Sequence, residues 1–435
     1  MRSRYQTHPL PGSLLALALL TAAACGNGEG PVSPAPIDEL PRPLTAEEKA
    51  VIAASNAFGF DLLREVHAAE TAPNVVLSPL SASLALGMTM NGAASETWEA
   101  MRSALRFGDL EEPAINASYH GLLDLLLDLD SRVTMEIANS IWAREGTPFV
   151  PAFFDAAREW FDAEVRELRF DDPASVDVIN DWASDNTAGR IDEIIERIDP
   201  DNIMFLLNAV YFKGQWTVQF DPDDTRPAPF TRVDGSQVQV PLMHYPSDRR
   251  VRYTRTPELE AVDLGYGGGA FAMTIVLPAA ERTLAETVAS LDTESWDALV
   301  AALDSAKIVL QVPRFRVRYD ELLNQPLTNM GMGIAFSGGA DFTRLTPLAE
   351  SYPVCIDFVR QKTFLEVNEE GTEAAAVTAV GVSVTSAPPS MIVDRPFLLA
   401  IRERHSGTIL FLGAIGDPTA EESEPADDPP GQPCG

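Results

Sequence analysis

The sequence has few of the side chains that enzymes and metal sites require. Its five histidines do not show the spacing of metal ligands, and neither a G-x-S-x-G nucleophile elbow nor a glycine-rich phosphate loop is present. The glycine-rich run Gly265–Gly269 indicates instead a turn between two strands. No convincing pairing of a nucleophile with a base is evident. We therefore predict that the protein is not an enzyme and that it uses neither a cofactor nor a metal ion.

Positive charge is also scarce. The chain has 32 Lys and Arg residues against 64 Asp and Glu residues, which gives a formal net charge of −32. An acidic surface repels nucleic acids and acidic polysaccharides of the heparin type, so neither is an expected partner. The hydrophobic content of 46% is nevertheless ample for a folded core.

The N-terminal apolar run is too short to span a bilayer comfortably. It extends from Leu14 to Leu20 and follows Arg2 and Arg4, a pattern typical of an export signal. Ala22-Ala23-Ala24-Cys25 then resembles a bacterial lipobox, although Leu is more usual where Ala22 stands. The pattern predicts a lipid on Cys25, which anchors the exported protein in a membrane; plain secretion after cleavage at an alanine is the alternative. Gly26, in place of Asp, favours the outer membrane or cell surface.

Composition divides the chain into four parts. Residues 1–25 are the predicted lipoprotein signal peptide, and residues 26–44, with little that is apolar, are a predicted proline-rich tether. Thr45-Ala46-Glu47-Glu48 has the pattern of a capped helix start, so the folded domain is predicted over residues 45–418. Residues 419–435 are rich in acidic residues and proline, which indicates a disordered tail.

Cysteine is rare as well, with three residues in the chain. Cys355 precedes a buried-strand pattern that leads to Asn368, which indicates a structural role, and Cys434 lies in the predicted tail. In an oxidising compartment these two residues can form a disulfide, but the flexibility expected of the tail leaves this pairing open.

The run from Glu369 to Ser386 alternates with a period of two. One face is entirely small or β-branched: Thr372, Ala374, Ala376, Thr378, Val380, Val382 and Val384. This period predicts a strand, although the alanine-rich start favours a helix, and Pro388 and Pro389 end the run. The run is therefore either an ordinary edge strand with a turn or a surface loop that becomes a strand in another setting.

Three segments of the chain resemble one family. Asn368-Glu369-Glu370-Gly371-Thr372-Glu373-Ala374-Ala375-Ala376 closely resembles the hinge of the serpin reactive-centre loop. Residues 394–401 and 407–413 resemble the final serpin strands, and the resemblance spans roughly residues 48–418. It implies an α+β serpin fold with three β-sheets, about eight to nine helices and an exposed reactive-centre loop, here in a bacterial lipoprotein-type member.

The resemblance also assigns roles to residues of the loop. The hinge comprises Glu369, Glu370, Gly371, Thr372, Glu373, Ala374, Ala375 and Ala376. The distances from Glu369 and from Pro396-Phe397 place the reactive bond at Thr385–Ser386, with Val384–Thr385 as the alternative.

Two further clusters are implied in the sheet that receives the loop. The breach, where the loop first enters, comprises Trp216, Arg314 and Glu369; a weak surface ion pair is the alternative reading of the two charges. The shutter, a polar cluster beneath the opening strands, comprises Ser78, Ser81, Asn208 and Gln361. Gln361 stands where the family usually has His, and it can donate and accept hydrogen bonds but cannot become charged.

The function implied is suicide inhibition of a serine protease. The protease forms an acyl-enzyme with the cleaved loop, and the loop then inserts into the main sheet as an extra strand. Thr385 or Val384 before the reactive bond suggests elastase-like or subtilisin-like proteases as partners of a monomeric inhibitor. The alternatives are a non-inhibitory serpin that acts as a cell-surface binding protein and an adhesin on the same scaffold.

Overall fold

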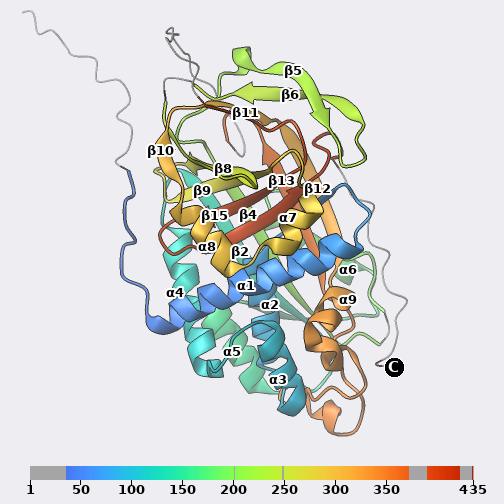
Figure 1. Ribbon diagram of the computed structural model, residues 1–435. Coiled ribbons are helices and arrows are strands. Elements are labelled where there is room, and N and C mark those ends of the chain that lie inside the picture. Colours follow the sequence, from blue (N-terminus) through green and yellow to red (C-terminus); the bar gives the residue numbers. More distant parts are fainter. Residues whose placement is uncertain (1–35, 200, 247–248, 372–388, 422–433, 435) are drawn as a thin grey trace, which may run out of the picture. The chain divides into compact units, whose positions relative to one another are not determined.

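The structure, a computed structural model, describes residues 36–199, 201–246, 249–371, 389–421 and 434 (Figure 1). The chain separates into two units, Met1–Ala35 and Pro36–Gly435, and all described residues belong to the second. None of the helices that these residues form is both long and apolar enough to cross a membrane.

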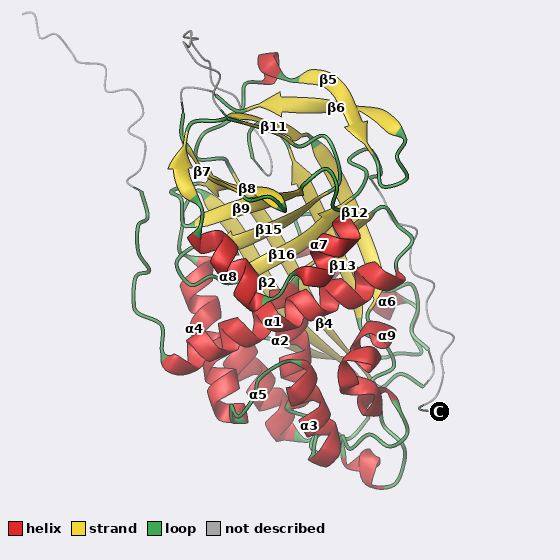
Figure 2. Cartoon of the chain, viewed as in Figure 1, coloured by secondary structure: helices red, strands yellow, loops and turns green. Residues whose placement is uncertain are grey.

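In the described residues the chain forms nine α-helices, most of which gather at one end of the Pro36–Gly435 unit (Figure 2). They are α1 (Ala46–Ala69), α2 (Pro79–Met90), α3 (Ser95–Ala104), α4 (Glu112–Leu127), α5 (Pro151–Phe161), α6 (Ala174–Asp185), α7 (Leu284–Ser290), α8 (Thr293–Ala301) and α9 (Asn324–Leu327). The predicted capping box is confirmed, because Thr45 and Glu48 exchange side-chain and backbone hydrogen bonds at the start of α1. Every residue of α2 except Ala85 is buried, so this helix forms the centre of the core.

Two sheets occupy the other end of the unit. The larger has the order β1 (Asn74–Leu77), β16 (Ile409–Ile415), β15 (Phe397–Glu403), β9 (Phe271–Pro278), β8 (Leu259–Tyr266), β7 (Val251–Arg255) and β10 (Asp304–Ala306). The smaller has the order β14 (Ser390–Ile392), β11 (Val309–Pro313), β6 (Gln237–His244) and β5 (Arg226–Thr231). Strands β9, β15 and β16 are buried along their whole length, as their nearly continuous apolar sequences require.

The remaining strands form two separate ladders. One has the order β3 (Glu164–Leu168), β2 (Val133–Arg144) and β4 (Met204–Gly214), and the other pairs β12 (Phe315–Leu322) with β13 (Arg360–Val367). β4 and β13 each stand at the edge of their own ladder, so the predicted main sheet is divided between these two strands. The mixture of helices and mainly antiparallel strands confirms the predicted α+β class.

The strand predicted from Cys355 to Asn368 is shorter than expected. Strand pairing is confined to β13, and residues 353–359 are not part of any ladder. Their backbone groups bond elsewhere: the Val359 N–H donates to the Asn324 side chain, and the Ile356 N–H donates to the Ala335 carbonyl. The apolar side chains Val354, Ile356, Phe358 and Val359 are half-buried and pack against the core, so the apolar pattern of this segment reflects these contacts rather than pairing with a neighbouring strand.

Residues 36–44, assigned by composition to the tether, lie against the folded domain. The Ile37 N–H donates to the Gly268 carbonyl at 2.9 Å, and the side chains of Ile37 and Leu44 pack on the core. The Arg42 guanidinium binds both carboxylate oxygens of Glu48, at 2.8 and 2.7 Å. Residues 36–44 are therefore held on the folded domain and do not form part of a free tether. Composition did not indicate this, because a few specific contacts hold the segment.

The C-terminal segment is also attached in places. Asn74 donates to the carbonyls of Asp417 and Ala420, and the Arg318 N–H in β12 donates to the Glu421 carbonyl at 2.6 Å. Cys434 forms a disulfide with Cys355, which settles the pairing that the sequence left open. The rest of the predicted disordered tail, residues 422–433 and 435, lies outside the described residues.

Candidate functional site: a slot between β4 and β13

A cavity of about 720 Å³ separates the start of β4 from the segment that leads into β13. Residues 204–208 line one side and residues 352–361 line the other. Ser81, Ala82, Ala85 and Leu86 of the buried helix α2 contribute to its wall. The space between the two ladders, called the slot below, is therefore open at this lower end, the end nearer α2, and is lined largely by apolar side chains.

The upper end of the slot is closed by the start of the predicted hinge. The N–H groups of Trp216 and Phe220 donate to the carbonyls of Glu370 and Glu369, at 2.8 and 2.9 Å. The Trp216 indole donates to the Asn368 carbonyl at 2.8 Å, and Gly371 forms an isolated antiparallel bridge with Gln215. The chain that continues β13 is thus fastened to the chain that continues β4.

Glycine at position 371 is required by this close approach. Its φ angle of +144° lies in the region that side-chain-bearing residues rarely adopt. A Cβ atom there would lie 2.1 Å from the carbonyl oxygen of Gly214, a backbone atom that cannot move aside alone. The Gly in the hinge motif therefore permits the hinge to rest directly on the end of β4.

The predicted breach residues Glu369, Arg314 and Trp216 meet here. Glu369 is buried, accepts a hydrogen bond of 2.7 Å from the Thr225 hydroxyl, and lies 3.5 Å from an Arg314 nitrogen. The Arg314 side chain is 51% exposed, so solvent screens the ion pair. Burial raises the pKa of Glu370 above its ordinary value, and the charge of Glu369 acts in the same direction.

Trp216 is the aromatic centre of the breach. Its ring stacks on Tyr266, with centroids 4.4 Å apart and planes 14° apart, and meets the edge of Phe220 at 6.1 Å. Stacking of this kind and the indole hydrogen bond fix the ring in one orientation. Trp216 therefore links the hinge to the larger sheet, because Tyr266 ends β8.

Gln361 and Ser78, both predicted shutter residues, form a paired contact. The Ser78 N–H donates to the Gln361 side-chain oxygen, and the Gln361 side-chain nitrogen donates to the Ser78 carbonyl, each at 2.9 Å. The Ser78 hydroxyl donates to the Leu410 carbonyl at 2.7 Å. Gln361 thus satisfies a buried donor and a buried acceptor at once, and this contact joins β13 to the start of α2.

The other two shutter residues belong to a second chain of hydrogen bonds. The Ser81 hydroxyl donates to Asn208, whose side chain donates to Asn139 at 2.7 Å. Asn139 in turn donates to the Phe161 carbonyl at 2.7 Å. The sequence analysis missed Asn139, although an asparagine close to the apolar pair Ile141-Trp142 was the signal that could have identified it.

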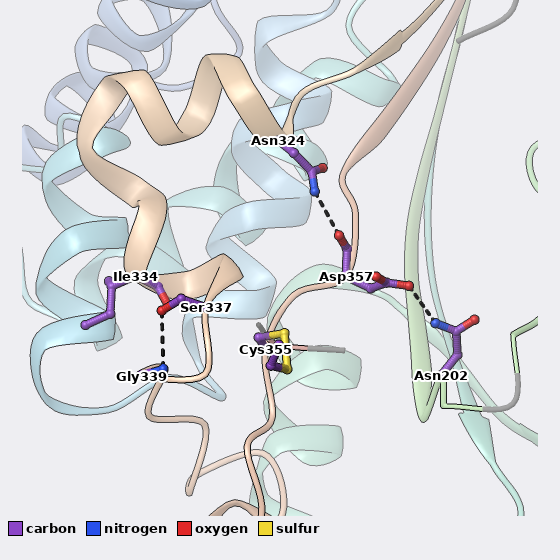
Figure 3. Close-up of a disulfide and its surroundings, with 8 residues drawn as sticks. Asn202, Asn324, Ile334, Ser337, Gly339, Cys355 and Asp357 are labelled. Atoms are coloured by element: carbon purple, nitrogen blue, oxygen red, sulfur yellow. Dashed lines mark hydrogen bonds between the residues drawn. A yellow bond between two sulfur atoms is a disulfide. The ribbon is translucent and has the colours of Figure 1, made fainter. Parts of the chain in front are cut away.

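Side-chain contacts cross the lower end of the slot in the described residues, among them a hydrogen bond to Asp357 and an Arg360–Glu196 ion pair of 3.6 Å. Asn202, just before β4, donates to the Asp357 carboxylate at 2.8 Å, and Asn324 donates to the Asp357 carbonyl at 2.8 Å (Figure 3). Burial raises the pKa of Asp357; the hydrogen bond from Asn202 opposes this, and the charges of Asp199 and Asp201 add to it. Nothing in the sequence alone indicated that these loop residues meet.

Several predicted residues lie outside the described part of the chain. These are the hinge residues Thr372, Glu373, Ala374, Ala375 and Ala376, the reactive-bond residues Val384, Thr385 and Ser386, and Cys25. In the part that is described, no three His, Cys, Asp or Glu side chains are grouped so that they could hold a metal ion.

Known proteins resemble this chain in sequence and in fold. The family model described as "Serpin (serine protease inhibitor)" matches residues 53–418. Iripin-8 of Ixodes ricinus is 34% identical over 376 residues, which cover 83% of this chain and 92% of Iripin-8. The native structure of tengpin, a thermophilic serpin, matches with a TM-score of 0.77 and 27% identity over 88% of this chain and 96% of tengpin.

Human thyroxine-binding globulin, solved with thyroxine, matches with the same TM-score of 0.77 at 27% identity, over 86% of this chain and all of that one. The family model extends from α1 to the end of β16, so it includes both ladders, the hinge and the slot between them. The sequence motifs, the fold and the family model agree, and the chain belongs to the serpin family.

Proposed function

We propose that this protein is a suicide inhibitor of serine proteases that traps its target by inserting the cleaved reactive loop between β4 and β13. One observation carries the proposal. The hinge, at the start of the loop, is already bonded to the chain that continues β4 at the upper end of the slot. At its lower end the slot contains an open cavity. A strand entering from Gly371 downward lies between two strands that are each at the edge of a ladder.

The proposed chemistry begins as ordinary proteolysis. The protease serine attacks the Thr385 carbonyl, the bond to Ser386 breaks, and the nitrogen of Ser386 leaves as a new N-terminus. The product is an ester between the protease and residues up to Thr385. Inhibition requires that the freed loop enters the slot before water hydrolyses this ester.

The residue types of the loop suit insertion. The face formed by Thr372, Ala374 and Ala376 has no charge, so its burial leaves no charge without a partner. New main-chain hydrogen bonds to both edge strands and burial of apolar side chains in the cavity favour insertion. The 15 residues from Gly371 to Thr385 extend ~50 Å as a strand, enough to carry the attached protease to the other end of the sheet.

The proposed targets follow from the residue before the reactive bond. Thr385, or Val384 if the bond is one residue earlier, is small and uncharged. Proteases with an acidic pocket that selects Arg or Lys gain no ion pair from either residue. We therefore propose elastase-like and subtilisin-like proteases as targets, with no separate acidic polysaccharide partner.

We further propose that the protein is anchored by a lipid on Cys25 at the outer membrane or cell surface. The support is the apolar run that ends in Ala22-Ala23-Ala24-Cys25. Cys25→Ser should move the protein from the membrane fraction to the soluble fraction. Unchanged fractionation would contradict the anchor without affecting the proposed inhibition.

Incubation with elastase and with subtilisin tests the inhibitory function. We expect a complex that survives boiling in detergent and that dissociates at alkaline pH, where the acyl ester is hydrolysed. Equimolar inhibitor should abolish protease activity. If every protease tried merely cuts the loop and remains active, the chain is a non-inhibitory serpin; thyroxine-binding globulin shows that one structural relative binds a small molecule.

A further inference from the structure

The disulfide between Cys355 and Cys434 closes a large covalent loop in the chain. The two residues are 79 positions apart, with their Cα atoms 5.8 Å from each other. The enclosed segment contains β13, the predicted reactive bond, and the strands β14, β15 and β16. The bond lies beside the lower end of the slot, because both cysteines line the cavity (Figure 3). Any cut in the reactive loop is therefore made inside a covalently closed ring.

Beyond Ala420, the described residues of the C-terminal segment are attached on the β12–β13 side of the slot, whereas Glu370 and Asp357 of the ring bond to Trp216 and Asn202 on the β4 side. Cys355 precedes β13, and the Glu421 carbonyl accepts a hydrogen bond from the Arg318 N–H in β12. β12 and β13 are paired from Phe315–Val367 to Leu322–Arg360, so they form one ladder. Separation of β4 from β13 consequently leaves both attachments of the C-terminal segment in place. The disulfide does not have to break or stretch when a strand enters the slot.

A cut at Thr385–Ser386 divides the protein into two pieces. Residues 386–435 carry β14, β15 and β16, and the last two strands are fully buried in the larger sheet. In a chain without a disulfide here, only noncovalent contacts would hold this piece. Once such a cut protein unfolds, its pieces diffuse apart and refolding depends on their concentration. A covalent link between Cys355 and Cys434 makes refolding intramolecular instead.

The same bond acts on the stability of the uncut protein. A cross-link restricts the unfolded chain, and the effect increases with the length of the closed loop. The native form and the form with an inserted loop are both folded and both satisfy the cross-link. The bond therefore disfavours unfolding while leaving unchanged the free-energy difference between the two folded forms, which drives insertion.

We propose that the Cys355–Cys434 disulfide keeps the two products of loop cleavage in one molecule and protects the fold against unfolding without hindering loop insertion. The first part depends only on a cut between residues 356 and 433. The part that concerns insertion rests on the proposed inhibitory function.

The first experiment cuts the reactive loop of the full-length protein with a small amount of elastase and compares gels with and without reductant. We expect one band without reductant and two fragments with it. Cys434→Ser should yield two fragments in both gels. Cys25→Ser, which removes the cysteine outside the disulfide, should behave like the wild type. Separate fragments from the wild type without reductant would overturn the proposal.

The second experiment measures unfolding temperature and inhibition for the same three proteins. We expect Cys434→Ser, and the wild type after reduction, to unfold about 5 °C lower than the oxidised wild type. The number of inhibitor molecules needed per protease, and the rate of complex formation, should remain within twofold of the wild type. A several-fold change in either quantity, or an unchanged unfolding temperature, would overturn this part.

The two proposals fail in different ways. If the wild type forms no covalent complex with any protease but its cut fragments remain joined by the disulfide, the inhibitory function is wrong and the retention of fragments stands. If complexes form but the fragments separate without reductant, the function stands and the role of the disulfide is wrong.

Discussion

The two ends of the slot are closed in different ways. At the upper end, two main-chain hydrogen bonds to Glu369 and Glu370, the indole hydrogen bond and the stacked rings of Trp216 and Tyr266 hold the hinge. At the lower end, a cavity of about 720 Å³ is crossed by the Asn202–Asp357 side-chain hydrogen bond. Main-chain hydrogen bonds therefore hold the two sides together at the upper end, as in a β-sheet, whereas side-chain contacts hold them at the lower end.

This difference indicates where the barrier to the proposed insertion lies. Main-chain hydrogen bonds and a stacked tryptophan must rearrange before the first hinge residues can enter, and the Ser78–Gln361 contact must adjust as the ladders separate. The lower end needs little rearrangement, because the cavity already offers space for small apolar side chains. We infer that the upper end and the shutter control the rate, and that the lower end contributes mainly to the final stability.

The largest effect is expected at the shutter. Gln361→Leu leaves the buried N–H of Ser78 without its acceptor, at a cost of ~1–3 kcal/mol, and leaves the Ser78 carbonyl with the Ala82 N–H as its donor. We expect a lower unfolding temperature, or spontaneous conversion to a form whose loop is no longer cut by elastase. Differential scanning calorimetry and elastase susceptibility after incubation measure these two outcomes.

Thr363→Val is the matched control for this substitution. Thr363 is also in β13, and its hydroxyl donates to the Val76 carbonyl at 2.6 Å, so the substitution leaves one acceptor without this donor. The loss should be smaller, about 1 kcal/mol. Wild-type behaviour of Gln361→Leu would show that the shutter does not restrain the ladders.

A pH-dependent effect on stability is expected at Tyr319 of β12, whose hydroxyl lies beside Glu70 and Glu321. The Tyr319 hydroxyl lies 3.0 Å from a Glu70 oxygen and 2.8 Å from a Glu321 oxygen, and one hydroxyl proton cannot serve two carboxylates. Burial raises the pKa of Glu321 to about 7, and the neighbouring Glu70 and Asp320 add to the shift. Burial would also raise the pKa of Glu70, but backbone and side-chain hydrogen bonds outweigh it and hold that pKa below its ordinary value.

The sign follows from proton binding. Between about pH 4.5 and 7 the folded protein keeps the Glu321 proton and the unfolded chain has lost it, so the contribution of Glu321 to stability falls as the pH rises through this window. Glu321→Gln should remove a decline of about 1–3 kcal/mol in the free energy of unfolding between pH 5 and 7. Parallel pH profiles of the variant and the wild type in urea unfolding would contradict the assignment.

The smallest effect is expected at the lower end of the slot. Asn202→Ala breaks the hydrogen bond between the two sides at a cost of ~1 kcal/mol; because the lower end contributes mainly to stability, loop insertion should accelerate by less than about fivefold. Asn324→Ala is the control, because it removes hydrogen bonds on the β13 side alone. A fluorescent label on the loop reports the rate. An effect of Asn202→Ala as large as that of Gln361→Leu would reverse the proposed order of the two ends.

The sequence predicted the parts of the site that depend on a local motif or on the family resemblance. Thr45 and Glu48 form the capping box that the local pattern predicted. The contact of Ser78 with Gln361 and the pair of Arg314 with Glu369 were implied by the resemblance, and Trp216 bonds to the residues on either side of Glu369. The missed residues make contacts between distant segments that neither a local pattern nor the resemblance covered. Asn202 contacts Asp357 because the fold places their two loops side by side, and no local sequence pattern indicates this. The attachment of Ile37 and the pairing of Cys434 with Cys355 were missed or left open for the same reason.

The most direct test of the central claim compares Thr372→Arg with Glu373→Arg, because these neighbours fall on opposite faces of the loop. In the proposed inserted strand, Thr372→Arg would bring an unpaired charge into the sheet, whereas Glu373→Arg would place its charge on the solvent face. A ~100-fold slower insertion needs only ~2.8 kcal/mol on the barrier, and hydrolysis of the ester then releases active protease. The measurement is the number of inhibitor molecules consumed per protease inhibited. The account predicts a large increase for Thr372→Arg with cleavage at the same bond, and little change for Glu373→Arg. Undiminished formation of the covalent complex by Thr372→Arg would show that loop insertion through this hinge is not how the protein works.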